Sequence, residues 1–355
     1  MEFPYDVVAV TGATGSFGQA ITRYLVKAFP HLRLRLISRG EHRQAEMQAL
    51  YASTPHLSFL IGDIRDVHRM RLAFKGADLV IHAAAIKRID TAESNPYEAI
   101  ATNVIGTWNI IQAAIDANVS QVITISSDKA CKPETLYGAS KQVSERLTIQ
   151  ANHYSGEQTR FCAARWGNVA GSQGSLIPLW RAQHAMGQPL TITSPAMSRF
   201  WLSMDEAVQF LCFIAREQSR GGLFIPHLPA FNILDLARAM LNKQADDCLV
   251  EGEDVQCIGL RGIEKISEDL ATDHELSRAR WHASHDESLS AYVIAPAVQH
   301  WKSFATASCK NAISSHDLEA MLPIKTCIPM EPYNSACWPY RLDVGALQKR
   351  LEVLP

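Results

Sequence analysis

Residues 11–18 read Thr11-Gly12-Ala13-Thr14-Gly15-Ser16-Phe17-Gly18, and this glycine-rich turn decides the fold. A short apolar strand is predicted before it, over Asp6–Val10, and an amphipathic helix after it. Glycines spaced G-x-x-G-x-x-G between a strand and a helix are typical of a dinucleotide site, because the backbone turns tightly and approaches the pyrophosphate. The helix N-terminus offers free N–H groups to the phosphates. We therefore expect a dinucleotide to contact Gly12, Thr14, Gly15, Ser16, Phe17 and Gly18.

The end of the second predicted strand, Leu32–Ile37, indicates which dinucleotide binds. An NAD enzyme usually places a carboxylate there to hold the ribose 2′-hydroxyl. This chain instead has Ser38 and Arg39, with Arg43 one helical turn later. A hydroxyl and two guanidinium groups suit a 2′-phosphate, which favours NADP. The alternative is that both arginines are ordinary solvated charges.

Two further strands, predicted at Leu57–Ile61 and Asp78–Ile81, end in candidate cofactor contacts. Asp63 suits an adenine amino group, or else the start of a helix. Small residues after the later strand leave room for a flat ligand at the sheet edge. His82 is interpreted as a core histidine. The candidates in this part of the chain are Asp63, Ile64, Ala83, Ala84, Ala85 and Lys87.

A single long helix is predicted over Pro96–Ala117, with Asn103 on a face that is otherwise apolar. The Asn103 side chain needs a partner, either in the local backbone or in the site, and we include it among the cofactor contacts. Strands and helices alternate up to this point and beyond. The alternation predicts an α/β fold with a doubly wound parallel (Rossmann) sheet.

The stretch from Ile125 to Lys141 reads as the end of a buried strand, a turn, and a helix with Pro133 in its first position. Tyr137 and Lys141 are four residues apart and share one helix face, so we expect the ammonium to lower the pKa of the phenol. A hydroxyl, a carboxyl and an amine precede them. The predicted acid–base group is Ser127, Asp128, Lys129, Tyr137 and Lys141.

Regular alternation stops after a sixth strand, predicted at Phe161–Arg165. We assign residues 1–165 to the NADP-binding domain, with its sheet completed by segments from about 205–230. Residues 166–355 form mostly a smaller, interleaved substrate lobe with a closing tail, including a helix at Gly345–Leu351 and an exposed loop at Ala305–His316. The loop from 166 to 175 offers many donors to a polar ligand, among them Asn168, Ser172 and Ser175.

Composition excludes several classes of protein. The chain has 355 residues and a formal net charge of −2, with no basic patch for nucleic acid or anionic lipid. It contains no apolar run near the ~18 residues that span a bilayer, and no signal peptide at its start. Its eight cysteines show no metal-binding spacing. We expect a cytoplasmic enzyme without a metal site, acting on a small molecule.

The motifs together resemble the extended short-chain dehydrogenase/reductase superfamily, and more narrowly the soluble, inverting dehydratases of UDP-N-acetylglucosamine. The resemblance rests on TGATGSFG (11–18), SRGEHRQAEM (38–47), GDIRD (62–66), HAAAIKRIDTAESNP (82–96), TNVIGTWNII (102–111), SSDKACKPETLYGASK (126–141), RWGNVAGSQGSLIP (165–178), SRFW (198–201) and GLRGIEK (259–265). It implies that Tyr137 initiates oxidation at C4 of the sugar and that Lys141 positions the ribose. It also implies that Lys129 takes the C5 proton and that Asp128 protonates the leaving C6 hydroxyl.

The same resemblance implies which residues hold the UDP-sugar and that the protein is a homo-oligomer. From the resemblance we expect Asn168, Arg199, Arg261 and Glu264 to contact the substrate. Lys87, Ser172 and Ser175 are added because of their places in the loops at the same sheet edge. Three positions depart from the family pattern: Trp166 replaces Tyr, Gln173 replaces Arg, and Ser198 replaces Thr. Two alternatives stay open, namely a UDP-sugar 4-epimerase, which needs no Asp-Lys pair, and a non-catalytic NADP-sensing protein.

Overall fold

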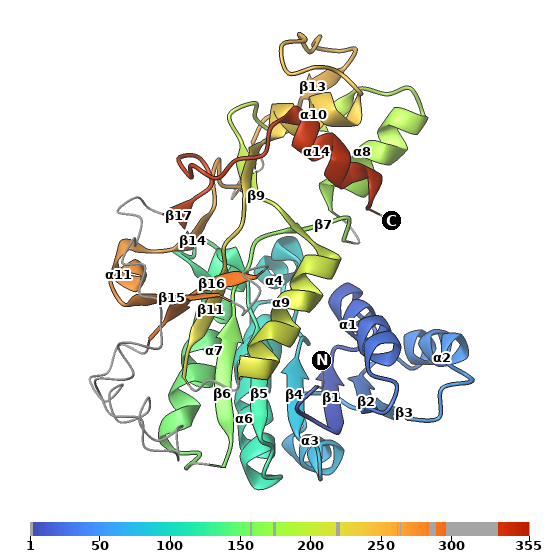
Figure 1. The fold of residues 1–355 in the computed structure, drawn as a ribbon, viewed down its shortest axis with the longest axis vertical. Helices are drawn as coiled ribbons and strands as arrows, with labels where there is room; N and C mark the ends of the chain where they lie inside the picture. The colour runs from blue at the N-terminus through green and yellow to red at the C-terminus, as the bar shows by residue number, and fades with distance from the viewer. Residues whose placement is uncertain are drawn as a thin grey trace.

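The computed structural model describes residues 3–156, 158–172, 175–217, 221–260, 262, 264–283, 289–295 and 333–354. Within these ranges the largest element is a nine-stranded sheet (Figure 1). Seven strands are parallel, in the order β11 (Leu223–Pro226), β6 (Arg160–Ala164), β5 (Gln121–Ile125), β4 (Leu79–His82), β1 (Val7–Thr11), β2 (Arg33–Ser38) and β3 (Leu57–Ile61). The strand order reverses at β1, so this is the predicted doubly wound fold.

Helices cover both faces of the sheet, and the alternation of side chains along β1 shows why. Val8 and Val10 point into one core with Ile21 of α1 (Ser16–Ala28) and Leu211 of α9 (Met204–Glu217). Val7 and Ala9 point to the opposite face. There they meet residues of α3 (Val67–Phe74) and α6 (Gly106–Asp116). A strand buried on both faces reads as a continuous apolar run, as Val7–Thr11 does.

Two antiparallel strands, β16 (Ser290–Ile294) and β15 (Ala279–Ala283), extend the sheet beyond β11. The repeating pattern of the first half gave no sign of them. The segment from 205 to 230 supplies β11 and the covering helix α9. The second half of the chain therefore contributes substantially to the large sheet as well as to the smaller lobe.

The smaller lobe has its own apolar core, at the top of Figure 1. Helices α8 (Leu176–Ala185), α10 (Ile233–Met240) and α14 (Val344–Glu352) pack there around β8 (Leu190–Ile192) and β13 (Val255–Cys257). Helix α14 confirms the predicted closing helix at 345–351. The predicted loop at 305–316 lies outside the described residues. No helix in the described ranges is long and apolar enough to cross a membrane.

A buried arginine joins the sheet to the helix α7 (Leu136–Gln150) and to the segment from Leu270 to Glu275. Arg165, which follows β6 and is 1% exposed, donates to both carboxylate oxygens of Glu145 on α7 at 2.9 and 2.6 Å. It also donates to Glu275 of α11 (Asp273–Leu276) at 2.9 Å through two nitrogens and to the Leu270 carbonyl at 3.0 Å. Both carboxylates therefore help to keep the guanidinium charged, although burial alone would lower its pKa.

We expect Glu145→Gln to lower the free energy of unfolding by about 3 kcal/mol, because it leaves a buried guanidinium short of one negative charge. Urea denaturation measures the change. The matched control is Asp116→Asn at the exposed Arg71–Asp116 pair, where the loss should stay below about 1 kcal/mol. Equal losses in the two variants would contradict the structural role given to Arg165.

Candidate functional site

The glycine-rich turn forms a close-packed cradle between β1 and α1. Gly12 has φ +71°, and a Cβ on it would lie 2.8 Å from the backbone nitrogen of Ala84. A Cβ on Gly18 would lie 2.4 Å from the Gly12 carbonyl oxygen. Gly15 caps α1 without a side-chain hydrogen bond, and the first turn carries no acidic residue. The helix N-terminus therefore presents N–H groups to the cradle, which fits a pyrophosphate.

Ser38 and Arg39 lie where β2 ends at the same edge of the sheet. The Ser38 hydroxyl oxygen is buried and has no hydrogen-bond partner among the described residues. An unpaired buried hydroxyl is costly and so points to a ligand group. The Arg39 side chain is 54% exposed, and its guanidinium lies 3.9 Å from Asp63. Arg43 is exposed on α2 (Glu41–Leu50).

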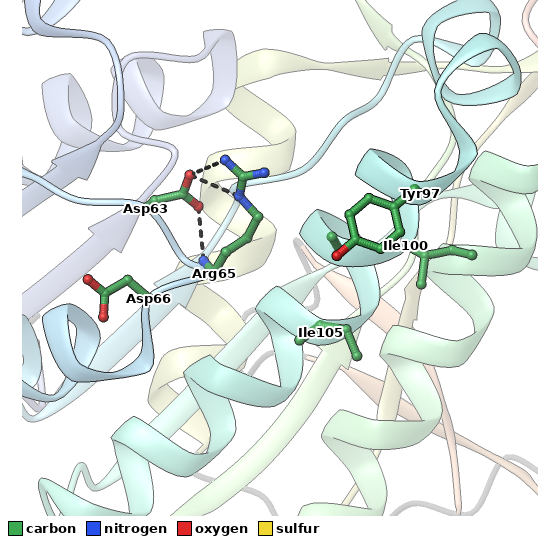
Figure 2. A pocket seen from close by; sticks show the side chains of 7 residues that line it. Asp63, Arg65, Asp66, Tyr97, Ile100 and Ile105 are labelled. Atoms are coloured by element: carbon green, nitrogen blue, oxygen red, sulfur yellow. Dashed lines mark hydrogen bonds and ion pairs between the residues drawn. The ribbon is translucent and has the colours of Figure 1, made fainter.

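Asp63 lies at the mouth of an open cavity of about 530 Å³ (Figure 2). Its carboxylate accepts hydrogen bonds from the backbone and side chain of Arg65 at 2.7–3.0 Å. Burial would raise the pKa of Asp63, but the bonds from Arg65 outweigh it and lower the pKa. Tyr97, Ile100 and Ile105 line the opposite wall. The carboxylate is thus already engaged locally, and it does not cap α3, which Asp66 does.

Several other residues that the sequence singled out lie at or near the end of β4. His82 is buried between the hydroxyls of Thr11 and Thr107, at 2.8 and 3.2 Å. Burial lowers its pKa to about 3, so it is a neutral core histidine, as predicted. Ala83–Ala85 form the half-buried loop against the glycine turn, beside Ile64, which is buried. Lys87 is exposed further along this loop.

Asn103 does not lie in a continuous α-helix, which corrects the prediction for 96–117. A short helix α5 (Pro96–Ile100) runs into a π-helical turn at Ala101–Ile105 before α6 begins. The Asn103 amide pairs with both the N–H and the carbonyl of Ile86, at 2.8 and 3.0 Å, and donates to Ser140 at 2.9 Å. Its partners are therefore the backbone of Ile86 and Ser140 on α7, and its role as a cofactor contact stays a prediction.

The acid–base residues are brought together where β5 ends. Ser127 caps a 3₁₀ turn over Asp128–Ala130 by accepting from the Lys129 N–H. Helix α7 then begins at Leu136, capped by Thr135, so Pro133 precedes the helix instead of starting it. A Cβ on Gly138 would lie 2.2 Å from the Lys129 carbonyl oxygen. Only glycine allows α7 to pack this closely on the turn.

Asp128 and Lys129 form an ion pair at the centre of this group. The Asp128 side chain is 2% exposed, and one of its oxygens accepts from the Ser127 hydroxyl at 2.8 Å and from the Lys129 ammonium at 3.0 Å. The ammonium also donates to Asn168 at 3.1 Å and lies 3.6 Å from Glu268. Burial alone would lower the pKa of Lys129, but the two carboxylates raise it above its ordinary value.

Tyr137 lies beside this pair, and its pKa is raised, contrary to the expected lowering. Burial is the main cause, while the Lys129 charge and a hydrogen bond with Ser127 act in the opposite direction. Lys141 instead donates to the Ile125 carbonyl at 2.6 Å, and burial lowers its own pKa to about 8. The cation that acts on the phenol is therefore Lys129, not Lys141.

A cavity of about 130 Å³ opens beside Lys129 and receives several of the predicted substrate residues. Its walls include Lys129, Asn168, Arg199, Glu264, Lys265 and Glu268. The Arg199 guanidinium is held by the carbonyls of Ser198, Lys265 and Ile266. Ser175 has a buried hydroxyl oxygen with no partner among the described residues, and Ser172 is half-buried. Arg261 and Gln173 lie outside the described residues. Glu268 and Lys265 were not among the predicted site residues; Lys265 ends the motif GLRGIEK (259–265), whereas Glu268 lies in none of the motifs.

Comparison with known proteins decides the family. The model of the polysaccharide biosynthesis protein family matches residues 8–288. The chain belongs to this family. All of the acid–base residues and the whole glycine-rich turn lie inside the matched region. The resemblance to the inverting dehydratases of UDP-N-acetylglucosamine that the motifs suggested is thereby confirmed.

Members of the family and solved structures that match the chain carry more than one activity in their names. A UDP-N-acetylglucosamine 4,6-dehydratase (inverting) from Campylobacter jejuni is 37% identical over 270 residues, which is 76% of this chain and 78% of the relative. A UDP-glucose 4-epimerase from Rickettsia rickettsii is 38% identical over 281 residues, 78% of this chain and 81% of the relative. The crystal structure of Pen from Bacillus thuringiensis is 28% identical with a TM-score of 0.81, covering 99% of this chain and 98% of that chain.

Proposed function

We propose that this protein is an NADP-dependent hydro-lyase that removes water across C5 and C6 of UDP-N-acetylglucosamine, with inversion at C5. The product would be UDP-2-acetamido-2,6-dideoxy-4-hexulose. The observation that carries the proposal is the Asp128–Lys129 ion pair, 3.0 Å long, next to Tyr137 at the carboxyl end of β5. A dehydratase needs an acid and a base in addition to the phenol, and this pair supplies both. The 37% identity with an inverting dehydratase supports the same substrate.

The side chains suggest an order of proton transfers. When bound, the nicotinamide nucleotide supplies the hydride acceptor for C4 and returns the hydride to C6. Tyr137 in its deprotonated form takes the proton of the C4 hydroxyl, and Lys129 in its neutral form takes the C5 proton, which the new ketone has acidified. Asp128 then receives a proton from the amine 3.0 Å away and delivers it to the leaving C6 hydroxyl. Asn168 accepts a hydrogen bond from the same side chain of Lys129 at 3.1 Å.

Incubation with UDP-N-acetylglucosamine tests this activity. We expect a product lighter by one water, with NMR couplings that report the inverted configuration at C5. A product of unchanged mass would instead indicate a UDP-sugar 4-epimerase. That second candidate is favoured by the Rickettsia relative, but it leaves the Asp128–Lys129 pair without a role. Tight NADP binding with no turnover would indicate a sensing protein.

We also propose that the cofactor is NADP, bound by the glycine-rich turn, Ser38, Arg39 and Arg43, and that the protein is a cytoplasmic homo-oligomer. The unpaired buried hydroxyl of Ser38 beside the exposed Arg39 supports a 2′-phosphate at this edge.

We expect Arg39→Ala to shift the preference from NADP towards NAD by about tenfold or more, since one charge-assisted contact to the 2′-phosphate is lost. Titration of both nucleotides by intrinsic fluorescence measures the ratio of dissociation constants. Arg33→Ala, an exposed arginine at the start of the same strand, is the control and should leave the ratio unchanged. An unaltered ratio in the Arg39 variant would remove the argument for NADP.

A further inference from the structure

Glu268 is a buried carboxylate that no motif predicted. Its side chain is 6% exposed, and its Oε1 lies 3.6 Å from the Lys129 ammonium. Its Oε2 is buried with no hydrogen-bond partner among the described residues. Glu268 lines the cavity beside Lys129, together with Asn168 and Arg199. Burying a carboxylate oxygen without a hydrogen-bond donor costs free energy, which suggests that this oxygen has a functional role.

Hydrogen bonds to two segments that are distant in sequence hold the backbone around Glu268. Its N–H donates to the Ser335 hydroxyl at 3.0 Å, and that hydroxyl lies 3.0 Å from the hydroxyl of Ser198. Ser198 in turn donates its N–H to the Ile266 carbonyl. Position 268 is thus held from two directions, by β9 (Ser198–Phe200) and by the segment around Ser335. These hydrogen bonds therefore determine where the Glu268 carboxylate lies.

Asp128 and Glu268 differ in their hydrogen-bond partners. Asp128 accepts hydrogen bonds from the Ser127 hydroxyl and from the backbone N–H and the ammonium of Lys129, all at its Oδ1. Glu268 has an unpaired oxygen, and burial and the charge of Asp128 raise its pKa, against the opposite effect of Lys129, Arg199 and Lys265. Glu268 is therefore the carboxylate beside Lys129 that can bind a further proton.

The proposed reaction needs a group that can hold one proton from Lys129. In the ion pair Lys129 is charged, and an ammonium cannot accept the C5 proton. We propose that Glu268 is a positioning residue that takes one proton from the Lys129 ammonium, so that the neutral amine can act as the base at C5. In this transfer one N–H bond breaks and one O–H bond forms, and the net charge of the cluster is unchanged. The inference rests on the proposed function, because it assigns the base at C5 to Lys129.

The cluster then completes the loss of water across C5 and C6 without a further proton. Lys129 takes the C5 proton while Glu268 keeps the first one. Lys129 passes its new proton to Asp128, which delivers it to the C6 hydroxyl, and the amine is neutral again. The titratable groups that face this cluster are Tyr137 on the Lys129 side, Arg199 and Lys265 on the Glu268 side, and Glu134 and Glu264 in the wall of the cavity.

The decisive variant is Glu268→Gln, which keeps the volume but cannot take the proton. At pH 7 we expect kcat to fall about 100-fold with KM changed by less than about threefold. We expect its kcat to rise tenfold per pH unit above neutrality as Lys129 loses its proton to solvent, whereas the wild-type profile stays flat. Oxidation at C4, seen as nucleotide absorbance in a single turnover, should be unaffected. Glu268→Asp should recover much of the activity.

The matched control is Asp269→Asn, which removes the neighbouring carboxylate, bound to Lys132 at 3.1 Å and to Asn334. It should leave kcat and the pH profile unchanged. A Glu268→Gln enzyme with wild-type kcat, or one whose loss is independent of pH and equal at the C4 step, would overturn the inference while leaving the dehydratase intact. If the wild-type protein forms no dehydrated product, the proposed function fails and the inference fails with it.

Discussion

Replacing Tyr137 by Phe should lower kcat by about a thousandfold, which corresponds to about 4 kcal/mol of transition-state stabilisation. Tyr137 is 8% exposed, and the Lys129 charge and a hydrogen bond with Ser127 act on its phenol, so under the proposed function it is the group that takes the C4 hydroxyl proton. Phe fills the same space in the small apolar cluster with Ala92 and Ala99. NADP affinity should therefore stay within about threefold of the wild-type value. Steady-state kinetics and a binding titration measure the two quantities.

Tyr154→Phe provides the control for this experiment, because Tyr154 is 51% exposed and packs on Trp108 away from the site. It should have wild-type activity. If Tyr137→Phe loses cofactor binding or unfolds at a lower urea concentration, the tyrosine is structural and the assignment of the base at O4 is wrong.

Lys129→Met should separate the two halves of the reaction. The methionine keeps the apolar stem but has no amine, so oxidation at C4 continues while removal of the C5 proton slows by about 100-fold or more. Incubation in deuterium oxide measures this, since the variant should incorporate little deuterium at C5 and release no dehydrated product.

Lys132→Met tests whether any nearby lysine has the same effect. Lys132 lies three residues further on and pairs with Asp269 at 3.1 Å with its side chain 51% exposed, and its replacement should leave deuterium incorporation unchanged. Undiminished incorporation in the Lys129 variant would remove that residue as the base at C5.

Much of the first half of the fold could be predicted because its signals are local. The apolar run Val7–Thr11, the glycine-rich turn and the amphipathic helix after it each follow from neighbouring residues. Strands β15 and β16 could not be predicted in the same way. They pair antiparallel with each other and through β11, so their stability comes from tertiary contacts and not from local pattern.

The same distinction applies to the site. Ser127, Asp128 and Lys129 were predicted to act together because they are consecutive in sequence. The effect of Lys141 was predicted from helix spacing alone, but the carbonyl of Ile125 captures its ammonium. Glu268 reaches Lys129 only through the packing of the smaller lobe. Spacing along a helix says which side chains share a face, and it does not say which of them bond elsewhere.

Because β11 lies between β6 and β16 in the sheet, one edge of β6 stays unpaired during part of translation. When the ribosome has released β6, that strand is an open edge, because its partner β11 begins at Leu223. At about 5–20 residues per second the edge waits several seconds for that partner. An exposed hydrophobic edge can recruit other chains. Helix α9 is synthesised just before β11 and packs on the face of the sheet through Phe210 and Leu211, so β11 itself closes this edge.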